Sequence, residues 1–136
     1  MGNELSLSWL QRRAWRATTR GHEVIADSPV ASGGNDLGMK PGELLAAAVG
    51  SCMAMDLSYY SERHPIIDLS KVTINLSWQD AEGKPSRTGK ITGTVSLPAG
   101  LSEAERTAIT HVMGSCKIRR TLEHVTEIDI DFAFEE

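Results

Sequence analysis

The stretch KPGELLAAAVGSCMAMDL, residues 40–57, decides how this chain folds. Pro41 has the fixed φ that suits the first position of a helix, and Glu43 places a carboxylate in the first turn, where the helix dipole favours it. The pattern predicts a helix from Pro41 until Pro65 stops it. As far as Met55 this helix is apolar on nearly every side, so we expect it to be buried on all faces.

The segment before this helix predicts a β-hairpin across residues 5–28. Apolar residues alternate with serines over 5–9, which is the period of a strand, and the strand continues less regularly through 14–19. A turn around Gly21 leads to a second short strand over 23–27. The Gly-, Pro- and Ser-rich residues that follow predict a loop.

The segment after the helix predicts two more strands, a helix and a last strand. Residues 71–78 and 90–97 alternate cleanly between apolar and polar side chains. Ser102 and Glu105 form a capping-box pattern, so a second helix is expected to begin there. Residues 127–134 alternate again and predict a closing strand. The apolar face of the second helix is predicted to hold Ile109, Val112, Met113 and Cys116.

The order of these elements, ββ–α–ββ–α–β, indicates the α+β class with a mainly antiparallel sheet. The chain has 136 residues, which fits a single domain over 1–136. Its net charge is −4, so we expect no nucleic-acid or anionic membrane partner.

The composition also favours a cytoplasmic location. The first residues lack the basic and apolar regions of a signal peptide. The longest apolar run, 44–55, is shorter than the roughly 20 residues that a membrane helix needs. In the cytoplasm a reducing thiol pool keeps cysteines free unless they do redox work.

Two cysteines, Cys52 and Cys116, are the candidate reactive groups, and they lie 64 positions apart. A buried free cysteine is more often a small hydrophobe than a reagent, and spacing alone does not decide between these interpretations. Cys52 is placed in mid-helix, so a low pKa would need a cation from elsewhere. Cys116 is placed near the far end of its helix, where the dipole disfavours an anion. If one thiol is the nucleophile, these positions favour Cys52 with an arginine, and Cys116 as the resolving thiol.

The two cysteine segments together resemble the OsmC/Ohr family. The resemblance rests on KPGELLAAAVGSCMAMDL and LSEAERTAITHVMGSCKIRRTLEHV, with the weaker RGHEVIADSPVASGGNDLG, and it covers roughly residues 9–134. It implies an OsmC-like fold, in which antiparallel sheets pack on two long central helices in an intertwined homodimer. It also implies thiol peroxidases that reduce organic hydroperoxides with a dithiol reductant and without a metal or bound cofactor.

The same resemblance assigns roles to individual residues. Cys52 matches the peroxidatic cysteine and Cys116 the resolving cysteine. Arg20 at the hairpin turn matches the arginine that activates the thiol, and Arg16 is the alternative. Glu43 is the candidate for the family's glutamate.

Two departures from the family pattern affect these roles. Gly42 occupies the position of the family's glutamate, and Glu43 lies one residue later, about 100° further round a helix. Glu43 is therefore either a functional group or only a favourable first-turn charge, and Glu23 or Asp27 could replace it. The second departure is Lys117, where the family usually has proline. Without that proline the helix could continue and move the second cysteine, or the lysine ammonium could stabilise a nearby thiolate.

The sequence therefore predicts a peroxidase of organic hydroperoxides. The alternative is a family member without turnover that binds a small apolar ligand or senses oxidants. The four histidines show no paired ligand spacing, so we expect no metal site. Four apolar residues could line a substrate pocket but are more simply core: Leu45, Met53, Met55 and Met113.

Overall fold

The computed structural model describes residues 3–65, 67–124 and 126–134. Within it the chain divides into two compact units. The first unit runs as far as Ala47 and takes in Ser77–Thr92, and the second comprises Ala48–Leu76 and the chain from Gly93 onward. The prediction of a single domain stays a prediction.

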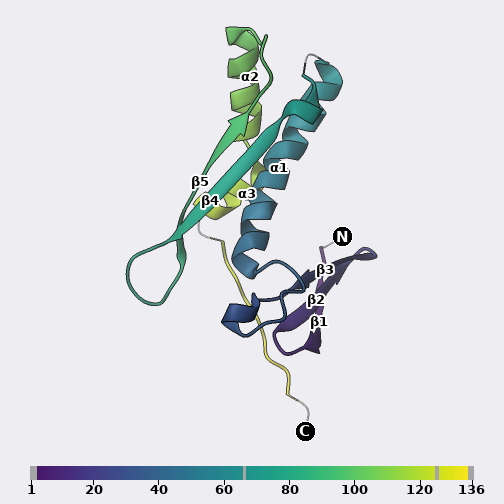
Figure 1. Ribbon diagram of the computed structural model, residues 1–136, viewed down its shortest axis with the longest axis vertical. Helices are drawn as coiled ribbons and strands as arrows, with labels where there is room; N and C mark the ends of the chain where they lie inside the picture. Colours follow the sequence, from purple (N-terminus) through teal and green to yellow (C-terminus); the bar gives the residue numbers. More distant parts are fainter. Residues whose placement is uncertain (1–2, 66, 125, 135–136) are drawn as a thin grey trace. The chain divides into compact units, whose positions relative to one another are not determined.

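Three antiparallel strands in the order β1-β2-β3 form the sheet of the first unit: β1 (Ser6–Gln11), β2 (Ala14–Thr19) and β3 (His22–Ala26) (Figure 1). The single long strand predicted at the start of the chain is wrong, because the chain reverses between β1 and β2. Arg12 takes a left-handed φ of 39° there, a conformation that no glycine or proline signals in the sequence. The predicted turn is confirmed, since Arg20 and Gly21 both have positive φ, as a two-residue hairpin turn requires.

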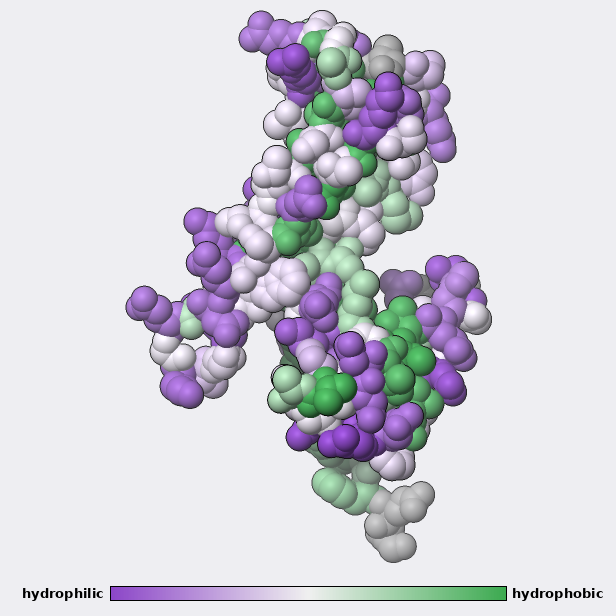
Figure 2. All heavy atoms as spheres, viewed as in Figure 1, coloured by the Kyte–Doolittle hydropathy of each residue, from purple (hydrophilic) through white to green (hydrophobic). Residues whose placement is uncertain are grey.

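One face of this sheet is apolar and exposed. Leu7 pairs with Ala17, which pairs with Val24, so all three lie on the same face. Hydrophobic residues gather over these strands in Figure 2. The exposed apolar side chains of the sheet are Leu7, Trp9, Trp15 and Val24.

The predicted long helix is confirmed as α1 (Pro41–Arg63), which ends before Pro65. The predicted loop precedes it and contains one short 3-10 helix, η1 (Val30–Ser32). The expectation that α1 is buried on all faces is wrong for the single chain. Side chains one turn apart, at Ser51, Met55 and Tyr59, are exposed along one stripe. The neighbours that the chain itself supplies cover only other faces of the helix.

The second helical region starts as predicted but is shorter. Ser102 and Glu105 form the capping box in full, with each side chain bonded to the other residue's N–H group. This helix, α2 (Glu103–Gly114), stops before Cys116, and a further short helix, α3 (Lys117–Glu123), follows. The second long helix implied by the resemblance is therefore divided in two.

A β-hairpin and the helices of the second unit enclose a small core. The hairpin consists of β4 (Thr73–Asp80) and β5 (Thr88–Ser96), close to the predicted strands, and a 3-10 turn, η2 (Leu69–Lys71), precedes it. Met53 packs against this core and Met113 lies within it, which confirms the core interpretation for both, whereas that interpretation is wrong for Met55, which is exposed. The buried members of this cluster are Leu57, Ile67, Leu101, Ile109 and Met113.

The closing strand predicted over 127–134 is wrong for the single chain. Residues 126–134 form no strand, because no strand of the same chain pairs with them in the described structure. Their alternating apolar side chains are 69–86% exposed: Ile128, Ile130, Phe132 and Phe134.

Candidate dithiol site

The structure brings the two cysteines together in the second unit. Cys52 lies in the middle of α1 and is half-buried, whereas Cys116 is completely buried, and both are free thiols. The Cys116 thiol donates to the carbonyl of Val49, at 3.9 Å, which holds it against α1 one turn before Cys52. Each thiol shifts the pKa of the other, so the two side chains lie close enough to interact. Sulfurs far apart in sequence therefore meet in space.

Cys116 does not lie at the end of a helix, and that expectation is wrong. The N–H of Ser115 closes α2 by bonding to the carbonyls of His111 and Val112. Cys116 then has the extended backbone of an N-cap, and its sulfur accepts the N–H of Arg119 at 3.4 Å. The dipole of α3 therefore favours negative charge at this position, the opposite of what the sequence indicated.

Two main-chain N–H groups of α3 complete the surroundings of Cys52. The Ile118 N–H has the largest effect in lowering the pKa of Cys52, and the Lys117 N–H lowers it less. They belong to the first turn of α3, where N–H groups have no carbonyl partner within the helix. The sequence reasoning missed these donors, although the Gly-Ser pair before Cys116 could have signalled the helix break.

The environment separates the pKa values of the two thiols. Hydrogen bonds from the Ile118 N–H and the Cys116 thiol lower the pKa of Cys52 below that of an ordinary cysteine, and the Lys117 N–H adds to this. Burial and the nearby Asp56 carboxylate oppose the effect without cancelling it. Burial raises the pKa of Cys116, and its hydrogen bond to Cys52 raises it further. Cys52 is therefore the thiol that ionises first.

The predicted activating groups lie in the first unit. Arg20 is exposed in the turn between β2 and β3, and its pairing with Cys52 stays a prediction. The alternative, Arg16, lies on β2 with its Nε 3.7 Å from the Glu23 carboxylate. No hydrogen-bond partner is found for this buried Nε among the described residues.

The candidate carboxylates have local partners. Glu43 accepts the N–H of Lys40 at 2.7 Å, which is the return half of a capping box at the start of α1. Asp27 is buried and accepts three N–H groups of its loop. They come from Ser28, Asn35 and Leu37, at 2.7, 3.2 and 3.1 Å respectively.

The expectation that α2 could continue through Lys117 and displace Cys116 is wrong. The helix ends at Gly114 although the family's proline is absent, so the break does not depend on that proline. The side chain of Lys117 is exposed, and its main-chain N–H contributes to lowering the pKa of Cys52.

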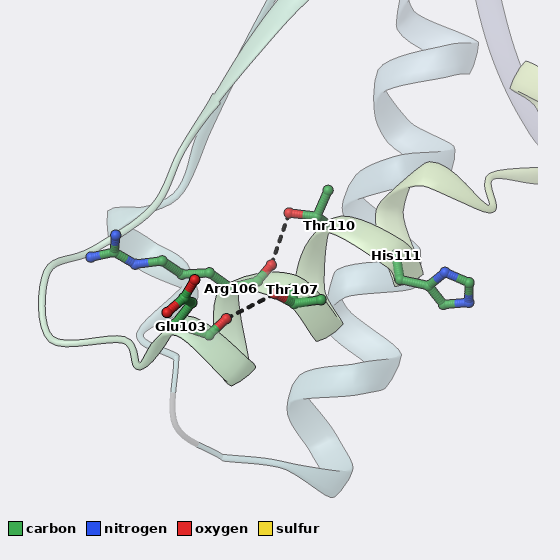
Figure 3. Close-up of a pocket in the computed structure, with 5 residues that line it drawn as sticks. All are labelled: Glu103, Arg106, Thr107, Thr110 and His111. Carbon is green, nitrogen blue, oxygen red and sulfur yellow. Dashed lines mark hydrogen bonds between the residues drawn. The ribbon is translucent and has the colours of Figure 1, made fainter.

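Two surface depressions lie near the helices of the second unit. The first, of about 440 Å³, follows the outer face of α2 (Figure 3). There the hydroxyls of Thr107 and Thr110 donate to carbonyls of their own helix, at 3.0 and 2.8 Å, so their protons are already used within the helix. The second, of about 550 Å³, runs between α1 and α2 and is lined by Asp56 and Ser115, the neighbours of the two thiols.

Within the described part of the chain, no three His, Cys, Asp or Glu side chains group as a metal site would require. In that same part, no helix has both the length and the apolar character needed to span a bilayer.

The fold and the paired thiols define a small α+β protein with a dithiol site. The family model for OsmC-like protein matches residues 33–131, and the chain belongs to this family. A comparison with curated proteins finds no match.

Solved structures share the fold at low sequence identity. A candidate osmotic-stress-induced and detoxification-response protein from Psychrobacter arcticus is 19% identical, with a TM-score of 0.77 over 89% of this chain and 88% of that chain. An OsmC-like protein from Mycoplasma pneumoniae is 15% identical, with a TM-score of 0.72 over 92% and 89%. A Legionella pneumophila protein titled an organic hydroperoxide resistance protein is 15% identical, with a TM-score of 0.63 over 90% and 89%.

Proposed function

We propose that this protein is a thiol peroxidase that reduces organic hydroperoxides to alcohols. One observation carries the proposal: the Cys116 thiol is held against α1 one turn before Cys52, and the surroundings lower the pKa of the half-exposed Cys52 and raise that of the buried Cys116. An ionised, accessible thiol beside a protonated, protected one is the arrangement that a nucleophile and a resolving thiol require.

The reaction has three balanced steps. The Cys52 thiolate attacks the distal oxygen of R–O–O–H, the O–O bond breaks, and the alkoxide takes up a proton to leave as the alcohol. Cys52 is thereby oxidised to a sulfenic acid. The Cys116 thiol condenses with it, forming the disulfide and releasing water. A dithiol, either a small molecule or a protein, then reduces the disulfide by exchange, which suits the reducing cytoplasm.

Arg20 and Glu43 are the remaining proposed catalytic residues. A guanidinium beside Cys52 would stabilise its thiolate and the charge that develops on the leaving oxygen. Glu43 would hold that guanidinium in place, in exchange for its present bond to the Lys40 N–H. Both roles come from the resemblance, and Arg20→Ala and Glu43→Gln test them.

The decisive experiment measures peroxide consumption. Purified protein with dithiothreitol and cumene hydroperoxide is expected to consume peroxide, and Cys52→Ser is expected to abolish this. Cys116→Ser is the matched control, because it removes the resolving thiol and leaves the nucleophile. Wild type that consumes peroxide no faster than Cys52→Ser would contradict the proposal.

We also propose that the active form is a homodimer. The single chain leaves uncovered the apolar face of the β1-β2-β3 sheet, the stripe on α1 around Met55 and Tyr59, and the alternating residues 126–134. Soluble monomers rarely expose apolar surface on this scale, and a second copy would cover it.

Sedimentation velocity tests the dimer. Phe132→Asp places a charge in the exposed apolar row, and we expect it to shift the protein toward monomer. Asp131→Asn, on the opposite side of the same segment, is the control and should stay dimeric. A wild type that sediments as a monomer would overturn the homodimer.

One observation favours a second function, in which the protein binds a small apolar ligand without turnover. The depression between α1 and α2 has a volume within the range of ligand pockets, and Tyr59, Tyr60 and Val112 supply its apolar part beside a majority of charged and polar side chains. A fluorescent apolar probe that binds wild type and Cys52→Ser equally, with peroxide consumption absent in both, would favour this function.

A further inference from the structure

We propose that the depression between α1 and α2 binds a quaternary ammonium group, with the Asp56 carboxylate pairing its charge and the ring of Tyr60 covering one side of it. The proposal rests on the second function above, in which this depression holds a ligand, and it names the chemistry of that ligand. It involves neither thiol, so it does not depend on peroxidase activity.

Asp56 supplies an acidic group whose charge no basic side chain pairs. It lies one turn after Cys52 on α1, is half-buried, and lines the depression. Among the described residues no Lys, Arg or His side chain forms an ion pair with it. A carboxylate that is partly removed from water gains more from a cationic partner than a fully exposed one does. The ligand that suits this position therefore carries a positive charge.

The ring of Tyr60 provides an aromatic surface beside this carboxylate. Tyr60 follows Asp56 by four residues in the same helix, so the two side chains are neighbours on its surface. The ring stacks on that of His64, one turn further on, with 4.4 Å between the ring centroids and 17° between the planes. His64 thus covers one face of the ring, and the opposite face is the one on the side of Asp56. The face of an aromatic ring attracts a cation.

The rest of the lining favours a methylated cation over a bare ammonium. Val112 adds apolar surface from α2, and Tyr59 lies at the rim, on the stripe that the proposed dimer covers. Glu62 and Arg63 carry opposite charges, which leaves Asp56 as the unbalanced charge of the lining when its histidines are neutral. A bare ammonium is strongly hydrated, whereas a quaternary ammonium presents apolar methyl groups and recognises aromatic rings.

Choline is the probe, titrated into the reduced protein at constant ionic strength and followed by calorimetry. The matched ligand is the neutral alcohol in which a tert-butyl group replaces the trimethylammonium, so that the shape is kept and the charge is lost. We expect choline to bind about tenfold more tightly, the factor that corresponds to about 1.4 kcal/mol. Equal binding of the two ligands would overturn the proposal and leave the apolar-ligand function intact. Absence of choline binding would also overturn it.

Two variants locate the site. Asp56→Asn keeps the shape of the side chain and removes its charge, so choline should bind about tenfold more weakly. Asp80→Asn is the matched control, because it makes the same change of net charge on β4, outside the lining of the depression. It should bind choline as wild type does. An unchanged affinity in Asp56→Asn, or an equal loss in Asp80→Asn, would overturn the proposal.

A second measurement covers the case in which Asp56→Asn fails to fold. In wild type saturated with choline, nuclear Overhauser effects should join the choline methyl protons to the ring protons of Tyr60. Bound choline without these effects would overturn the proposal. Phosphatidylcholine vesicles then replace free choline: co-sedimentation that choline competes away assigns the site to a lipid head group, and its absence assigns the site to a free cation.

Discussion

Replacing Cys116 by alanine and by serine tests whether its side chain caps α3. The side chain is completely buried, its sulfur accepts the Arg119 N–H, and its thiol donates to the Val49 carbonyl. Alanine removes the buried sulfur and with it both hydrogen bonds. Serine keeps the acceptor and the donor and changes only the size and polarity of the atom.

The structure sets the size of the expected effect. Removing a buried group of about the size of a methylene costs about 1 kcal/mol, and losing an N-cap acceptor costs about another 1 kcal/mol. We therefore expect Cys116→Ala to lower the free energy of unfolding by about 2 kcal/mol. The loss in Cys116→Ser should be smaller by the value of the cap, about 1 kcal/mol.

Urea unfolding of the reduced protein measures this difference. All proteins are compared at one fixed concentration, because the stability of an oligomer depends on it. Near the melting temperature the two variants should differ by about 4 °C. If they unfold at the same urea concentration with the same slope, the Cys116 side chain is not a cap, and the assignment of its position is refuted.

Two further predictions follow from the pKa shifts. The pKa of Cys52 is lowered and that of Cys116 is raised, so iodoacetamide at neutral pH should add one label per chain, on Cys52. Peptide mass spectrometry should find Cys116 unmodified. Equal labelling of the two cysteines would contradict this order of pKa values. Burial raises the pKa of Asp27, but the hydrogen bonds from Leu37, Ser28 and Asn35 outweigh it and lower the pKa overall. The ionised carboxylate therefore stabilises the folded protein at neutral pH, and this stabilisation is lost as the pH falls through the folded-state pKa of Asp27. Asp27→Asn should therefore lower the free energy of unfolding at pH 7, and the difference from wild type should shrink in acid. Urea unfolding at several pH values measures this difference. A difference that stays constant with pH would show that the carboxylate charge is irrelevant.

The sequence by itself determined the elements that depend on local signals. Pro41 and Pro65 bracket α1, and Ser102 with Glu105 starts α2, because caps and prolines act within a few residues. The alternation of apolar and polar residues likewise predicted β4 and β5. The reversal of the chain at Arg12 could not be predicted from the sequence, because arginine rarely takes a positive φ and no neighbouring residue is typical of a turn.

Only the tertiary structure decided how the two cysteines are related. Their identity was visible in the sequence, but a separation of 64 positions says nothing about distance, and the fold holds Cys116 against α1 one turn before Cys52. The helix break before Cys116 then turned its expected position from a helix end into a helix start, and it aimed the N–H groups of Lys117 and Ile118 at Cys52. The order in which the thiols ionise thus depends on main-chain N–H groups near Cys52 and on the burial of Cys116, and neither follows from the identity of the side chains along the sequence.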